Sequence, residues 1–174
     1  NMKKLILLVI PVIFGLGSAS PHRVQSVDTL TLTNVEPNFV KPTYTLEVEP
    51  LIEAMIWVES RGDDSAYCKR EDAVGCLQIR PIMLRECNRI LGIQKSELEY
   101  ALEDRWSREK SIEIFHIVNS YHNKNNTYEA IARSWNGGST WAQKSNTKKY
   151  WRKVNRQLKK QQKDEHIDNG FANL

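Results

Sequence analysis

The segment from Pro50 to Ser60 constrains the fold of this chain most strongly, because it joins an apolar helical face to a carboxylate. Three apolar residues precede Glu59 by seven, four and three positions, which is the spacing of side chains on one face of an α-helix. These residues are Ile52, Met55 and Ile56. Gly62 and the turn-forming residues after it predict the end of the helix just beyond Ser60. The apolar face has to pack against other elements, and it brings Glu59 with it.

Two features of this position are expected to raise the pKa of Glu59. Partial burial disfavours the charged carboxylate, and the negative end of the helix dipole disfavours it again. A carboxyl group that keeps its proton near neutral pH can act as a general acid. The ordinary alternative is a solvated glutamate on a helix surface. The rest of the sequence has to decide between these two interpretations.

Periodicity in the rest of the chain predicts a mainly α fold. Apolar residues recur at helical spacing in several further segments, with no convincing strand pattern between them. These segments are 81–92, 96–102, 107–122, 128–135 and a last helix from about Thr147 that carries Tyr150, Trp151, Val154 and Leu158. In the segment 107–122 apolar residues occupy more than one face, which predicts a buried central helix.

Capping signals predict where these helices begin and end. Pro81 suits a first helical turn and Gly92 a helix stop. Ser96 and Glu99 have the spacing of a capping box, which predicts a short helix through residue 102. Thr127, or the residue before it, is expected to cap the helix that follows.

The helical domain is predicted to occupy residues 47–160, and three other segments flank it. Residues 1–19 combine a positive start, an apolar run and small residues, as in a signal peptide. Residues 20–46 contain three prolines and no helical period, which predicts an extended linker or arm. Residues 161–174 are polar and are expected to form a frayed tail.

The leader predicts an exported protein, periplasmic or extracellular. An uncut membrane anchor is the alternative, and it is disfavoured because the apolar run is shorter than the roughly 20 residues of a spanning helix. In an oxidising compartment the chain's three cysteines, Cys68, Cys76 and Cys87, would be able to form one disulfide. A bridge between Cys68 and Cys76 would close a short loop after Glu59, but the sequence does not choose among the three possible pairs.

Positive charge is concentrated near the C-terminus. The formal net charge of +4 falls to +2 without Lys3 and Lys4 of the leader, whereas nine lysines and arginines and no acidic residue lie between Lys144 and Lys163. In an exported protein such a basic helix suits an acidic cell-wall polymer or anionic lipid, or it is a solvated face. A nucleic-acid partner is disfavoured by the leader and by the lack of a recognition-helix motif.

Four short segments of the chain, taken together, allow a comparison with a known family through their order and spacing. They are Glu59-Ser60, Gly75-Cys76-Leu77-Gln78-Ile79-Arg80-Pro81, Ser134-Trp135-Asn136-Gly137-Gly138 and Tyr150-Trp151-Arg152-Lys153-Val154. In this order and spacing they resemble the soluble lytic transglycosylase family, enzymes similar to goose-type lysozyme that cleave the glycan strands of peptidoglycan. The resemblance runs from about residue 51 to residue 154. It implies a lysozyme-like helical domain with a glycan-binding cleft.

The resemblance also implies roles for individual residues. Glu59 matches the catalytic acid of the family, and Ser60 matches the serine beside it. Gln78 matches a glutamine that lines the cleft, and Asn136 matches the asparagine of the family's Tyr-Asn-Ala-Gly segment. Tyr150 matches a late tyrosine that faces the acid across the cleft. The last four are therefore predicted to bind substrate.

The chain departs from the family pattern at several places. Cys76 and Leu77 stand where the family usually has Leu-Met, Trp135 stands in place of Tyr, and Gly137 in place of Ala. These changes are expected to reshape sugar subsites without removing the chemistry.

The family mechanism that the resemblance implies uses one carboxyl group. Glu59 would protonate the leaving sugar oxygen while the substrate's own N-acetyl group stabilises the cationic centre. The ionised Glu59 would then take the proton of the muramyl 6-hydroxyl as that oxygen closes onto C1, which gives a 1,6-anhydromuramyl end without water. Nearby acids such as Asp63, Asp64, Glu71 and Asp72 lie in a polar loop and are interpreted as turn and solvation chemistry.

Two other functions remain as hypotheses, a muramidase of the same fold that uses water and a non-catalytic glycan-binding protein. No cofactor is predicted, and no metal site, because the cysteine spacing does not fit a zinc knuckle and His116 and His122 lie far along the chain. The expected partner is the peptidoglycan strand. A small domain without a wall-anchoring module also suits a protein that opens the wall locally for a secretion, conjugation or phage apparatus.

Overall fold

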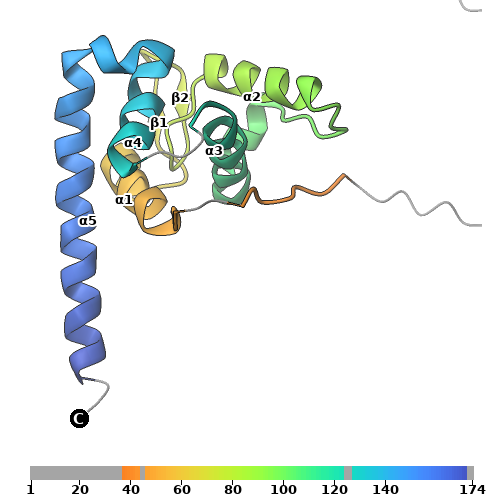
Figure 1. The fold of residues 1–174 in the computed structure, drawn as a ribbon. Coiled ribbons are helices and arrows are strands. Elements are labelled where there is room, and N and C mark those ends of the chain that lie inside the picture. The colour runs from red at the N-terminus through yellow and green to blue at the C-terminus, as the bar shows by residue number, and fades with distance from the viewer. Residues whose placement is uncertain (1–36, 44–45, 124–126, 172–174) are drawn as a thin grey trace, which may run out of the picture. The chain divides into compact units, whose positions relative to one another are not determined.

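Helices dominate the protein in the computed structural model, which describes residues 37–43, 46–123 and 127–171 and confirms the prediction of a mainly α fold (Figure 1). The elements in chain order are α1 (Glu49–Ser60), β1 (Tyr67–Cys68), β2 (Ala73–Val74), α2 (Pro81–Ile93), the 3₁₀ helix η1 (Leu102–Trp106), α3 (Arg108–His122), α4 (Tyr128–Gly137), the 3₁₀ helix η2 (Gly138–Gln143) and α5 (Ser145–Phe171). The predicted signal peptide and most of the predicted linker lie outside the described residues.

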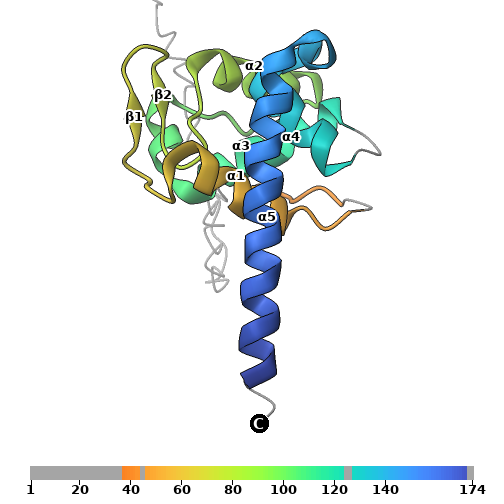
Figure 2. The ribbon, with the colours of Figure 1, turned by 90° about the vertical axis from the view of Figure 1, so that its left-hand side faces the viewer.

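The core is built around α1 and α3. The predicted apolar face of α1 is buried, with Ile52, Met55 and Ile56 each at most 2 % exposed. Along α3 the residues from Ile114 to Asn119 are all buried, which confirms the prediction of a buried central helix. α2 packs on α3, while α5 packs along α1 and α4 (Figures 1 and 2). This packing brings residues from α1 and α5, which are far apart in sequence, to the same place.

The end of α1 lies where the sequence predicted it, although Arg61 rather than Gly62 takes the first left-handed conformation. Arg61 has φ 62°, and its N–H donates to the Trp57 carbonyl at 3.1 Å. Gly62, with φ 85°, follows it. The two residues together turn the chain sharply after Glu59 and direct it into the loop that leads to β1.

A small antiparallel sheet after α1 was not expected from the sequence. β1 and β2 contain two residues each, with Tyr67 opposite Val74 and Cys68 opposite Ala73. Strands of two residues are too short to show an alternating pattern, which explains the wrong prediction. In the structure Cys68, Cys76 and Cys87 are free thiols, and the suggested bridge between Cys68 and Cys76 is not present.

The short helix predicted through residues 96–102 is also wrong, since 3₁₀ helix η1 begins only at Leu102. The Ser96 hydroxyl accepts from the Leu98 N–H at 3.1 Å, which makes a local turn instead of a helix cap. The Asn88 side chain of α2 then bonds both backbone groups of Tyr100, at 2.8 and 3.0 Å. These tertiary hydrogen bonds hold the segment out of helical geometry.

Helix ends elsewhere differ from the predictions by a few residues. Gly92 lies inside α2, and Lys95 supplies the left-handed residue after it, with φ 54°. Ser107 and Thr127 cap α3 and α4 through their side-chain oxygens, and the cap by Thr127 was predicted. α5 continues to Phe171, well past the point where we expected a frayed tail, and its C-terminal half extends beyond the other helices (Figure 2).

Within the described ranges, no helix combines the length and the apolar character that a membrane crossing requires.

Candidate active site

Glu59 lies half-buried in the last turn of α1, with part of the residue open to solvent and its carboxyl group surrounded by protein atoms. Burial raises the pKa of Glu59 from its ordinary value of 4.5 to about 7. The Tyr150 hydroxyl and the positive charges of Arg80 and Lys153 lower the pKa, while the negative charge of Glu71 raises it. Burial outweighs these opposing effects, so the carboxyl group holds its proton through a large part of the neutral pH range.

Tyr150 reaches Glu59 from α5 and is itself buried, with 8 % of its surface exposed. Burial raises the pKa of the Tyr150 hydroxyl well above its ordinary value, and the Glu59 carboxyl raises it further. The two groups interact, but their contact falls outside strict hydrogen-bond geometry, so within the described residues the hydroxyl has no full partner. A buried hydroxyl in this state is available to a ligand.

Two cations and a second acid surround the carboxyl group at a greater distance. Arg80, just before α2, lies near Glu59 and also faces Glu71, with 3.7 Å between Arg80 Nη1 and Glu71 Oε2. Lys153 lies three residues after Tyr150 on α5 and therefore shares its side of the helix. The deprotonated form of Glu59 thus has positive charges nearby.

Gln78 follows β2 and holds the loop beside the site. Its backbone is left-handed, with φ 49°, and its amide nitrogen donates to the carbonyls of Ala66 at 3.1 Å and Gly75 at 3.0 Å. Both donors of the side chain are therefore used within the loop, while its carbonyl oxygen is left to accept. The prediction that Gln78 binds substrate stays a prediction.

Arg105 and Gly75 attach the same loop to the rest of the protein. The buried Arg105 side chain donates to the carbonyls of Asp72 at 2.8 Å and Ile79 at 3.1 Å. Gly75 has φ 77°, and a Cβ atom at this position would stand 2.1 Å from the Arg105 carbonyl oxygen. Close backbone packing here fixes the position of the loop relative to α1.

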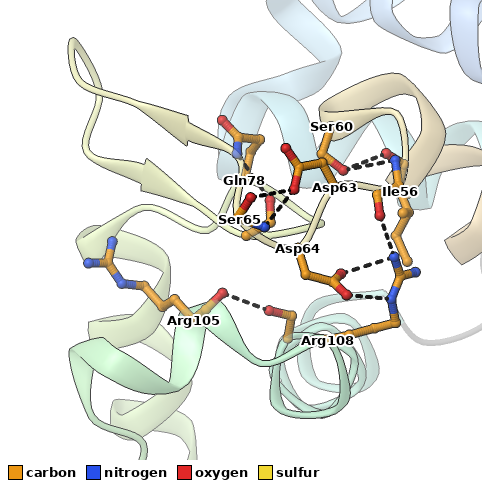
Figure 3. Close-up of polar contacts among 11 residues, drawn as sticks. Ile56, Ser60, Asp63, Asp64, Ser65, Gln78, Arg105 and Arg108 are labelled. Atoms are coloured by element: carbon orange, nitrogen blue, oxygen red, sulfur yellow. Dashed lines mark hydrogen bonds and ion pairs between the residues drawn. The ribbon is translucent and has the colours of Figure 1, made fainter.

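Ser60 has hydrogen bonds within its own turn. Its hydroxyl donates to the Ile56 carbonyl at 3.1 Å and accepts from the Gly62 N–H at 3.2 Å (Figure 3). These bonds stabilise the end of α1, which carries Glu59. Substrate binding by Ser60 remains a prediction. The hydroxyl oxygen would have to accept a further hydrogen bond from the substrate.

The acids of the loop after α1 take part in local structure, as their polar sequence suggested. Asp63 accepts from the N–H and the hydroxyl of Ser65 at 2.8 and 2.6 Å, and these bonds lower its pKa. Asp64 pairs with Arg108 at 2.9 Å (Figure 3). Glu71 is the acid of this loop whose charge affects the pKa of Glu59.

A cleft of about 800 Å³ lies between α2, α3, α4 and η2. Its lining includes Arg80, Phe115, Asn119, Trp135 and Trp141, whereas Glu59 is not among the lining residues. The electrostatic influence of Arg80 on Glu59 shows that the cleft and the carboxyl group have a neighbour in common. The buried Nδ2 atom of Asn119, a residue of the cleft lining, has no hydrogen-bond partner among the described residues.

Asn136 lies half-buried in the last turn of α4, and its side-chain amide makes no hydrogen bond to another described residue. Trp135 before it packs on Phe115 with 5.3 Å between ring centroids. The structure therefore brings Glu59 and Tyr150 into direct interaction, while Asn136 is not among the residues that line the cleft and has no described bond to either.

Sequence reasoning missed Arg80 and Lys153 as members of the site. Lys153 was detectable, because a residue three positions after Tyr150 lies on the same side of a helix. Arg80 carried no such signal, since its position depends on the loop that Gln78 and Arg105 hold. Asn119 was missed because a polar residue inside a buried helix is normally satisfied there.

Comparisons with models of protein families, with curated proteins and with solved structures gave no match for this chain. Among the described residues no group of three or more His, Cys, Asp or Glu side chains is arranged to hold a metal ion. What the geometry offers is one carboxyl group that can give and take a proton at neutral pH, with a tyrosine hydroxyl and two cations around it.

Proposed function

We propose that the protein is an exported peptidoglycan lytic transglycosylase, a lyase that cleaves the β-1,4 bond between MurNAc and GlcNAc and leaves 1,6-anhydroMurNAc ends. The observation that carries this proposal is the Glu59 carboxyl group, whose pKa of about 7 results from burial beside the Tyr150 hydroxyl. In this proposal the helical domain is lysozyme-like, and the glycan strand extends from Glu59 past Arg80 into the cleft lined by Trp135.

A single carboxyl group with a pKa near neutrality suits both steps of this reaction. Glu59 donates its proton to the glycosidic oxygen, and the bond from that oxygen to C1 of the muramyl unit breaks while the substrate's N-acetyl group stabilises the positive centre. The Glu59 carboxylate then accepts the proton of the 6-hydroxyl as O6 bonds to C1. The proton that left Glu59 is thus replaced, and no water is consumed.

The surroundings of Glu59 support this cycle. Arg80 and Lys153 favour the carboxylate that exists between the two steps, and burial favours its return to the protonated form. Tyr150, with a buried hydroxyl that lacks a full partner, is proposed to hydrogen-bond the sugar at the reacting centre. Ser60, Gln78 and Asn136 are proposed as further substrate contacts.

A muramidase of the same fold is the second candidate, and one observation favours it. Glu71 influences the pKa of Glu59, so a second carboxylate is electrostatically close to the acid. In a hydrolase this group would activate water. Its pairing with Arg70 at 2.9 Å and with Arg80 at 3.7 Å argues for a structural role instead.

Digestion of purified peptidoglycan followed by mass spectrometry tests the proposal. We expect 1,6-anhydroMurNAc ends from the wild-type protein and a loss of roughly three orders of magnitude in rate for Glu59→Gln, because the proton donor is gone. Glu53→Gln is the matched control, since Glu53 is an exposed glutamate on the same helix.

Other outcomes separate the alternatives. Reducing muramic acid ends without anhydro product would identify a muramidase. Strand binding without turnover, unchanged in Glu59→Gln, would identify a non-catalytic glycan-binding protein. The proposal also includes export, which is tested by locating the protein in fractionated cells. It further includes a role in opening the wall for a secretion, conjugation or phage apparatus.

A further inference from the structure

A groove between α1 and α5 lies apart from the cleft described above. It has a volume of about 310 Å³ and is lined by Trp57 and Arg61 of α1 and by Lys153, Arg156 and Lys160 of α5, with Val58 and Gln157 between them. Four of these seven side chains are cations and none is an acid. Apart from Lys153, these residues have no part in the chemistry proposed for Glu59.

The aromatic ring of this groove is open to solvent. Trp57 is 40 % exposed, although it lies on the helix whose Leu51, Ile52, Met55 and Ile56 are buried. The Arg61 guanidinium lies 5.5 Å from the centre of the ring, so a cation and an aromatic surface stand together. Exposed tryptophan rings stack on apolar faces of ligands and offer a large contact area at a small entropic cost.

The cations of the groove are not neutralised by the protein. Among the described residues, Arg61, Arg156 and Lys160 form no ion pair. Lys153 acts on the Glu59 carboxyl group, and Asp164, one turn beyond Lys160 on α5, forms no ion pair with Lys160. The groove therefore retains an excess of positive charge for a ligand.

The spacing of the cations suits a linear ligand. Arg156 and Lys160 are four residues apart on α5, which places them about 6 Å apart along the helix axis. Lys153 lies a further turn toward the N-terminus of α5 on the same side. A chain of sugar units that carries one anionic group on each unit can meet successive cations in this row.

We propose that the groove between α1 and α5 binds an acidic polysaccharide, with a sugar ring stacked on Trp57 and carboxylate groups paired with Arg61, Arg156 and Lys160. The ring distinguishes this site from a surface for a plain phosphate chain, which offers no apolar face for stacking. The groove is a place of attachment separate from the proposed chemistry, so it does not depend on cleavage by Glu59.

Calorimetric titration of the full chain with polygalacturonate, a linear acidic polysaccharide, tests this site. We expect saturable binding that weakens as salt rises, with about tenfold weaker affinity for Trp57→Ala and for the double variant Arg156→Ala with Lys160→Ala. Trp106→Ala is the matched aromatic control, because Trp106 is 44 % exposed and lies on η1. Lys148→Ala with Lys149→Ala is the matched charge control on α5.

Both controls are expected to bind within about twofold of the wild type, because surface charges outside a contact contribute little. If the control pair and the groove pair of substitutions weakened binding equally, the ligand would bind the whole basic helix and the proposed groove site would be wrong. If linear polyphosphate or anionic vesicles bound as tightly as polygalacturonate or more tightly, the proposed preference for a sugar chain would be wrong. Glu59→Gln should bind like the wild type even where it abolishes cleavage, which separates this test from that of the proposed function.

Discussion

The contact between the Tyr150 hydroxyl and the Glu59 carboxyl group controls the acidity of the proposed catalytic residue. The hydroxyl lowers the pKa of Glu59, which burial has raised to about 7. The same hydroxyl is buried without a full hydrogen-bond partner, a state that costs free energy. The Tyr150 hydroxyl therefore lowers the stability of the folded protein, and it leaves a polar group beside Glu59 that a ligand can hydrogen-bond.

Tyr150→Phe separates these two effects. Without the hydroxyl the pKa of Glu59 should rise above about 7, which can be measured by NMR titration of the labelled carboxyl carbon. The free energy of unfolding should stay the same or increase by up to about 1 kcal/mol, because a poorly satisfied polar group has been removed. If Tyr150 contacts the sugar as proposed, the cleavage rate should fall despite the preserved stability.

Tyr100→Phe is the control for this variant. Tyr100 is as buried as Tyr150, but its hydroxyl donates to Glu113 at 2.7 Å. Its loss should cost about 1–2 kcal/mol in urea unfolding and leave the pKa of Glu59 unchanged. An unchanged pKa of Glu59 in Tyr150→Phe would contradict the described interaction.

At the scale of elements, the loop from β2 to α2 positions the site, and Gly75 is its tightest point. Gly75→Ala combines a left-handed φ of 77° with a Cβ atom 2.1 Å from the Arg105 carbonyl oxygen. We expect a loss of about 2–4 kcal/mol in the free energy of unfolding, measured by urea denaturation.

Gly62→Ala separates strain from collision. Gly62 also has a left-handed φ, 85°, but a Cβ atom there would have no neighbour within 4 Å. This variant should lose only about 1 kcal/mol, which is the cost of the backbone conformation alone. Equal losses in the two variants would mean that the contact with Arg105 relaxes easily.

The elements that the sequence predicted correctly are those with a long apolar period. α1, α3 and α4 contain several apolar residues at helical spacing together with a cap or a stop, and tertiary contacts agree with these local signals. The short strands and the loop from residue 96 to residue 101 could not be predicted this way. Their conformation depends on Asn88 and Arg105, which bond to them from other parts of the chain.

The candidate site was predictable to a similar extent. Glu59 and Tyr150 were identified, and the structure brings them together. The internal hydrogen bonds of Ser60 and Gln78 were not foreseen, because a motif does not show which donors the loop itself uses. The position of Arg80 depends on the same loop, so it became visible only in three dimensions.

At the scale of the whole molecule, two buried groups with opposite linkage to pH determine how stability varies in mildly acidic solution. Burial, together with the smaller effect of the nearby Lys41 charge, lowers the pKa of His116 from 6.5 to about 4. Glu59, in contrast, has its pKa raised from 4.5 to about 7. The carboxyl groups with lowered pKa, such as Glu86 at about 2, titrate below this range.

The signs of the two contributions follow from the protons bound in each state. Between about pH 4.5 and 7, Glu59 keeps its proton in the folded state and loses it in the unfolded state, so stability falls as pH rises. Between about pH 4 and 6.5, His116 stays neutral in the folded state and is protonated in the unfolded state, so stability rises with pH. From about pH 4.5 to 6.5 the two slopes oppose each other.

We therefore expect the free energy of unfolding of the wild-type protein to be nearly constant from about pH 4.5 to 6.5. Replacing either group should leave the pH dependence of the free energy of unfolding that the other group causes. Glu59→Gln should become more stable as pH rises, by about 1.4 kcal/mol per pH unit, and His116→Gln should become less stable at the same rate. Urea unfolding at four pH values across this window measures both slopes. A constant loss of stability from the substitution itself shifts each line without changing its slope, so the test holds even if His116→Gln is destabilised. Parallel pH dependence of the two variants would show that these groups do not control the stability of the folded chain in acid.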